Sequence, residues 1–258
     1  QRLVSFGDAE LAFSYLGTGN ADGEPVPGPK ATGSWQPIPG QERESIPTAP
    51  TVGDAVDGVG VYAARDVTFD EPGFWQVDVT VEVDGEIQRA EAAFEVFAER
   101  ETVGPGDPAP RTVQHLPGAD GVPVKAIDSR AEQDGTVPDP ELHSMTVADA
   151  IASGKPTMLV VATPVYCVSR FCGPITDAVQ DLAATFSEQM NFVHIEVWRD
   201  FERGELNKAA AEWIYPPGID EAKEPWVWVI GADGSIVVRF DNVASEDELR
   251  AAVDDVLD

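Results

Sequence analysis

The segment PWVWVIGADGSIVVRF (residues 225–240) carries a clear strand pattern and decides the fold of the second half of the chain. Two apolar runs flank the Ala-Asp-Gly turn at residues 232–234, and these residue types favour a tight connection. The segment therefore predicts a β-hairpin. Alternation places Trp226 and Trp228 on one face of its first strand, where we expect them to pack in the core.

Strands and helices alternate around this hairpin. Continuous apolar runs predict buried strands at residues 156–163 and 191–198. Apolar residues at three- and four-residue spacing, with capping residues, predict helices at 146–154, 173–187, 207–214 and 245–257. Strands separated by helices imply parallel crossovers, so we expect a mixed sheet with helices on both faces.

Both cysteines of the chain lie in TPVYCVSRFCGPITD (residues 163–177). Cys167 and Cys172 are five positions apart, a separation that allows the Cα distance of about 4.4–6.8 Å that a disulfide needs. Cys172 would begin a helix, whose free N–H groups stabilise a thiolate, and Arg170 would add positive charge. This favours Cys172 as the low-pKa thiol. Cys167 follows the strand that ends near Thr163, so the sequence leaves open which thiol attacks a substrate.

Residues 171–174, Phe-Cys-Gly-Pro, resemble the Trp-Cys-Gly-Pro-Cys motif of thioredoxins, with Ile175 in place of the second cysteine. Pro225 matches the cis-proline of that family. The longer ATPVYCVSRFCGP is similar to exported, often lipid-anchored bacterial thioredoxin-like proteins with two cysteines five apart. The resemblance implies a thioredoxin-like α/β three-layer domain over residues 141–258, with Cys167, Cys172 and Pro225 as catalytic residues.

Residues 1–100 are predicted to be rich in β-strands. Alternation predicts a strand at 10–16, and residues 74–97 form two alternating runs around Asp84-Gly85, a favoured hairpin turn. The pattern F-x-x-P-G-x-W-x-V-x-V resembles strands of bacterial immunoglobulin-like domains, which implies an antiparallel sandwich. Residues 17–41, rich in Gly and Pro, are predicted to form a long loop, and residues 101–140 a connector between two domains.

The charge of the chain excludes two classes of partner. It has 46 acidic and 17 basic residues, a formal net charge of −29, which repels nucleic acid and anionic lipid. No apolar run reaches the 18 residues of a membrane span. Because the chain begins with Gln1, a signal peptide or a lipid anchor upstream is compatible with it. We expect an extracytoplasmic location, in the cell envelope or secreted.

The resemblance and the cysteine pair together predict a function. We expect an extracytoplasmic thiol–disulfide oxidoreductase-like protein that exchanges with protein or small-molecule thiols and disulfides and needs no cofactor. One alternative is a non-catalytic cell-envelope binding protein, in which the disulfide is structural. Another is copper handling of the Sco type, although a histidine is missing before the hairpin, where Glu224 stands, and His194 is predicted to be a core residue.

Overall fold

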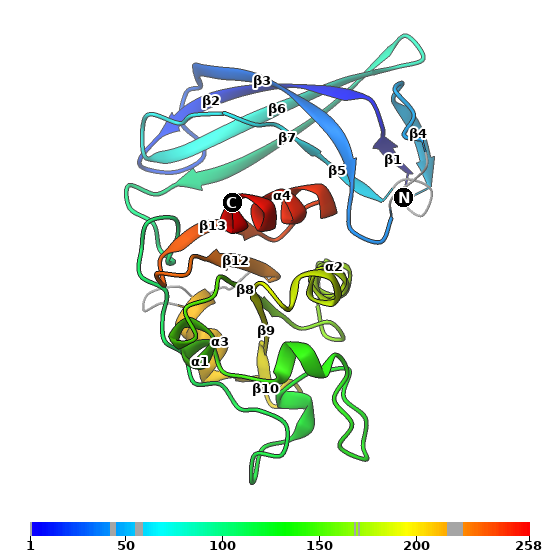
Figure 1. The fold of residues 1–258 in the computed structure, drawn as a ribbon. Helices are drawn as coiled ribbons and strands as arrows, with labels where there is room; N and C mark the ends of the chain where they lie inside the picture. Colours follow the sequence, from blue (N-terminus) through cyan, green and yellow to red (C-terminus); the bar gives the residue numbers. More distant parts are fainter. Residues whose placement is uncertain (1, 42–44, 55–58, 168, 170, 216–223) are drawn as a thin grey trace. The chain divides into compact units, whose positions relative to one another are not determined.

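The chain folds into two compact units, Gln1–Arg100 and Glu101–Asp258 (Figure 1). The computed structural model describes residues 2–41, 45–54, 59–167, 169, 171–215 and 224–258. Arg170, to which the sequence assigned a charge near the cysteines, lies outside the described residues.

The first unit is built around a curled antiparallel sheet with strand order β5-β3-β2-β6-β7 in the described residues (Figure 1). Its strands are β2 (Asp8–Gly17), β3 (Val26–Pro37), β5 (Gly60–Ala63), β6 (Gly73–Val83) and β7 (Glu86–Val96). Strands β1 (Arg2–Ser5) and β4 (Thr51–Asp54) pair separately. The predicted hairpin over residues 74–97 is confirmed, since β6 and β7 join at Asp84 and Gly85, both with positive φ.

Strand β3 corrects the prediction of a long loop over residues 17–41. Pro27 and Pro29 lie in the half of β3 that pairs only with β2, so their missing N–H groups cost no bond to a second neighbour. Gly28 leaves space for a core aromatic ring, because a Cβ there would lie 2.6 Å from Trp75. Gly and Pro are therefore compatible with a strand here because of its pairing and packing, and these contacts cannot be recognised from local turn signals.

The second unit contains a mixed sheet with strand order β13-β12-β8-β9 among the described residues. Strand β8 (Thr157–Ala162) pairs in parallel with β9 (Asn191–Glu196) and antiparallel with β12 (Trp226–Ile230). Strand β13 (Ile236–Asp241) pairs antiparallel with β12, which confirms the predicted hairpin. A separate two-stranded ribbon joins β10 (Trp198–Asp200) and β11 (Glu205–Leu206).

The helices of this unit follow the spacing in the sequence. Their bounds are α1 (Val147–Ala152), α2 (Cys172–Phe186), α3 (Lys208–Ile214) and α4 (Glu246–Leu257), with 3-10 helices η1 (Val124–Ala126) and η2 (Pro140–His143). Capping boxes fix the starts of α1 and α4, where Thr146 and Ser245 accept from the third helical N–H. No helix in the described part of the chain is long and apolar enough to cross a bilayer.

The core of the second unit is centred on β8, which is buried along its whole length. Met158, Val160 and Ala162 pack with residues of α2 and α4 in one hydrophobic cluster. Leu159 and Val161 pack with residues of α1 and α3 in another. The alternation of side chains along β8 thus serves both clusters, and the strand ends immediately before the cysteine loop.

The predicted fold class is wrong. The chain is mostly β, with about 20 % of its residues helical, and its strands are divided among several sheets. In the described part of the first unit, a curled five-stranded sheet and the separate β1–β4 pair stand in place of the two stacked sheets of an immunoglobulin-like sandwich. In the second unit α1 and α3 are only 6 and 7 residues long, and a C-terminal thioredoxin-like α/β three-layer domain is not evident.

The predicted connector, residues 101–140, belongs to the second unit. Pro108 forms an isolated bridge with Ser235 beside β13, and Trp228 donates to Val103 O at 3.0 Å. Asp128 is fully buried. This segment has little regular structure, yet it contributes buried residues to the second unit.

Candidate functional site: the Cys167–Cys172 corner

The two cysteines form a disulfide at the end of β8 and the start of α2. Their Cα atoms are 6.0 Å apart, within the range of ordinary disulfides. Cys172 is the first residue of α2 and is 0 % exposed. Cys167 lies in the preceding loop, is half-buried, and packs against the same hydrophobic cluster. The pair is therefore asymmetric, and Cys167 is the cysteine that solvent can reach.

The peptide bond between Glu224 and Pro225 is cis, and it lies beside this pair. The Ser169 hydroxyl donates to Glu224 O at 3.1 Å and lies 3.1 Å from Cys167 Sγ. One serine thus links the cysteine loop to the cis-peptide. The structure brings together all three residues predicted from the sequence, Cys167, Cys172 and Pro225.

Glu224 is a part of the corner that the sequence did not single out as functional. One of its carboxylate oxygens and the two sulfurs all lie within 4.8 Å of one another. Burial raises the pKa of Glu224. Its position directly before Pro225 was the available signal in the sequence. That position was considered only for a histidine ligand, which is missing there, and the carboxylate was given no role.

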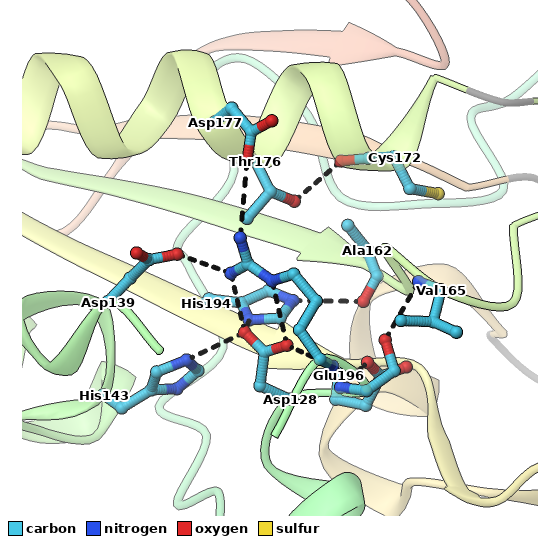
Figure 2. A network of polar contacts seen from close by, with 12 residues as sticks. Asp128, Asp139, His143, Ala162, Val165, Cys172, Thr176, Asp177, His194 and Glu196 are labelled. Carbon is cyan, nitrogen blue, oxygen red and sulfur yellow. Dashed lines mark hydrogen bonds and ion pairs between the residues drawn. The ribbon is translucent and has the colours of Figure 1, made fainter. Parts of the chain in front are cut away.

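A buried polar network lies behind the cysteine loop, centred on Asp128 (Figure 2). Arg130 approaches Asp128 with Nη2 at 2.8 Å from Oδ2 and Nε at 3.1 Å from Oδ1. His143 Nε2 lies 3.3 Å and His194 Nδ1 3.4 Å from Oδ2. Arg130 also pairs with Asp139 at 2.6 Å and reaches Asp177 of α2 at 3.3 Å. One carboxylate therefore organises three cationic or polar side chains.

The contacts of His194 define its protonation. Its Nε2 lies 3.1 Å from Ala162 O, which can only accept, and its Nδ1 faces the Asp128 carboxylate. Burial opposes protonation, but the hydrogen bond and charge of Asp128 raise the pKa of His194. Burial lowers the pKa of His143. The surroundings of His194 therefore favour its protonated form, whereas those of His143 disfavour it.

Asp128 carries the negative charge at the centre of the network. Burial alone would raise the pKa of Asp128, but hydrogen bonds from His143, His194 and Arg130 hold it well below its usual range. Asp128 is thus a buried carboxylate that stays ionised. The sequence prediction that His194 is a hydrogen-bonded core residue is confirmed.

The network supports the cysteine loop through backbone contacts. Glu196 of β9 accepts from Ser129 N at 2.8 Å, and the Ser129 hydroxyl accepts from Val165 N at 3.1 Å (Figure 2). Val165 stands two residues before Cys167. On the helix side, the Thr176 hydroxyl donates to Cys172 O at 2.7 Å. Buried polar groups therefore fix the backbone on both sides of the disulfide.

Asp128, Ser129 and Arg130 were not predicted as site residues. They lie in the irregular segment 101–140, and in a chain with 46 acidic residues a single aspartate carries no signal of its own. The signal that was available is the rarity of histidine. The chain has three histidines, and two of them, His143 and His194, meet at Asp128. Only His194 was predicted to be a core residue, so the meeting of two of the three histidines at one carboxylate was not predicted.

An open cavity of about 390 Å³ lies beside the cysteine loop, and Tyr166, the residue before Cys167, is part of its lining. Tyr166 stacks on Phe201 with ring centroids 4.2 Å apart, and Trp198 meets Phe201 edge-on at 5.4 Å. All three line the cavity together with the residues around η1. The accessible cysteine is therefore next in sequence to an aromatic wall that an apolar group can contact.

The histidines and the cysteines belong to separate groups. Asp128, His143 and His194 lie together, whereas no described histidine belongs to the group of the two sulfurs. Asp128 is already paired with the Arg130 guanidinium. The ligand set expected for copper handling of the Sco type is therefore not assembled by the described residues.

Comparison with known proteins finds no match for this chain among protein-family models, curated proteins or solved structures.

Proposed function

We propose that the chain is an extracytoplasmic thiol–disulfide oxidoreductase-like protein whose redox centre is the Cys167–Cys172 pair. The observation that carries the proposal is the asymmetry of the pair beside a cis-proline. Cys167 is partly accessible, while Cys172 is fully buried at a helix start. The proposed relationship to thioredoxin-like proteins rests on the same corner, residues 171–174 with cis-Pro225.

The asymmetry assigns different roles to the two thiols. In the reduced protein the Cys167 thiolate attacks a substrate disulfide, forms a mixed disulfide, and releases one substrate thiolate. Cys172 then attacks Cys167 Sγ, which releases the second substrate thiol and closes the protein disulfide. The sequence favoured Cys172 as the low-pKa thiol and left the attacking thiol open. We assign the attack to Cys167, because a nucleophile that is 0 % exposed cannot reach a bulky disulfide.

The proposed substrates are protein or small-molecule disulfides. The cavity beside Tyr166 offers room for an apolar group next to the substrate sulfur. The chain's charge of −29 favours neutral or basic substrates over polyanions. The location outside the cytoplasm is supported by the disulfide alone, since such bonds persist in oxidising compartments.

A redox titration tests the proposal. The protein is equilibrated in thiol–disulfide buffers of stepped potential, and its free thiols are counted by alkylation and mass. We expect half-reduction between about −270 and −120 mV, the range of protein oxidoreductases. A pair that stays oxidised below about −300 mV would instead support the alternative, a structural disulfide in a binding protein. The Cys167→Ser/Cys172→Ser double variant gives the baseline.

A further inference from the structure

A buried thiol that must act as a nucleophile needs a group to take its proton. Cys172 is 0 % exposed, so bulk water does not reach it. Its surroundings are the apolar side chains of a hydrophobic cluster that contains Ile175 and Val227. Burial in such surroundings disfavours the thiolate. The resolving step of the proposed function therefore requires a nearby base.

We propose that Glu224 is the general base that accepts the Cys172 proton during resolution and returns it to the departing substrate thiolate. This inference rests on the proposed function and adds to it a residue and a proton path. The carboxylate oxygen and both sulfurs lie within 4.8 Å of one another, a span that direct contact or one bridging water closes.

The surroundings of Glu224 suit this role. No hydrogen bond or ion pair joins its carboxylate to another described residue. Its main chain is held, since the Ser169 hydroxyl donates to Glu224 O and the next peptide bond is cis. Along the hairpin, Arg239 pairs with Asp241 at 2.9 Å and also donates to the Thr102 hydroxyl at 2.7 Å, so its guanidinium is engaged by other groups. Burial, with no contribution from a described charge, raises the pKa of Glu224 toward that of a thiol.

The step balances in atoms and charge. With the mixed disulfide at Cys167 formed, the Cys172 S–H proton passes to the Glu224 carboxylate. The Cys172 sulfur attacks Cys167 Sγ, the Cys167–substrate S–S bond breaks, and the electron pair leaves with the substrate thiolate. That thiolate takes the proton from the Glu224 carboxylic acid. The two cysteines are oxidised, and the substrate disulfide is reduced to two thiols.

Single-turnover reaction of the reduced protein with glutathione disulfide tests the assignment. Quenched samples report the glutathionylated intermediate by mass. In Glu224→Gln we expect this intermediate to accumulate and its resolution to slow at least tenfold at pH 6–7. The difference should shrink above about pH 9, where a thiol ionises unaided. Glu224→Asp should recover part of the rate, and Glu188→Gln, at an exposed glutamate, should resolve like the wild type.

The outcomes separate the two proposals. If wild-type protein forms no mixed disulfide at Cys167, the proposed function and the role of Glu224 both fall. If wild type resolves normally and Glu224→Gln matches it at every pH, only the role of Glu224 falls. Should Glu224→Gln not fold, the carboxyl of Glu224 is titrated by carbon NMR in the wild type. A titration that does not change between the oxidised and reduced protein overturns the proposal.

Discussion

At the scale of single residues, Asp128 is the side chain on which the polar network depends. It is buried, and it contacts Arg130, His143 and His194. Removing one partner of a buried ion pair leaves the other charges uncompensated. We expect Asp128→Asn to lower the free energy of unfolding by about 3 kcal/mol, and the exposed control Asp120→Asn to change it little.

The loss of stability in Asp128→Asn should depend on pH. The lowered pKa of Asp128 contributes stability above about pH 4 that is lost as pH falls. The raised pKa of His194 contributes stability below about pH 6.5 that is lost as pH rises through its folded value. The deficit of Asp128→Asn should therefore be largest between about pH 4 and 6.5. Urea unfolding at pH 3, 5.5 and 9 checks this, and a deficit that is equal at all three contradicts it.

At the scale of elements, the loop between β8 and α2 joins the disulfide to an aromatic cavity. Tyr166 stacks on Phe201 there, immediately before Cys167. We expect Tyr166→Ala to lower kcat/KM about fivefold for a disulfide peptide with an aromatic residue beside its cysteine, since one aromatic contact is worth about 1 kcal/mol.

Two controls make that measurement specific. Bis(2-hydroxyethyl) disulfide is too small to reach the cavity, and its reduction should be unaffected by Tyr166→Ala. Phe97→Ala removes an exposed aromatic ring in the first unit and should leave both substrates unaffected. An equal loss with the small and the aromatic substrate would show that Tyr166 shapes the loop and does not bind the substrate.

The elements also show what the sequence can predict. The hairpin of β12 and β13 follows from alternation around a turn, and α4 follows from apolar spacing and the Ser245 cap, both of which are local signals. Strand β3 was missed, because its Gly and Pro residues are explained by the neighbouring strands and by Trp75. Local patterns predict an element when the residues of that element determine its structure. They fail when contacts with neighbouring elements determine it.

At the scale of the whole molecule, local patterns could not predict the architecture. The β6–β7 hairpin was identified, yet whether such hairpins stack as two sheets or continue in one curled sheet depends on long-range pairing, such as β2 with β6. The candidate site divides in the same way. Cys167, Cys172 and Pro225 could be found from motifs. The roles of Asp128 and Glu224 depend on contacts with residues distant in the sequence, which local patterns do not predict.

The central claim is that Cys167 attacks and Cys172 resolves, and trapping of single-cysteine variants tests it most directly. Cys172→Ser and Cys167→Ser are each reacted with glutathione disulfide, and the rate of glutathionylation is followed by mass. We predict rapid modification of Cys167 in Cys172→Ser, and at least about tenfold slower modification of Cys172 in Cys167→Ser, because burial shields that sulfur. Equal rates, or a faster reaction at Cys172, would contradict the account.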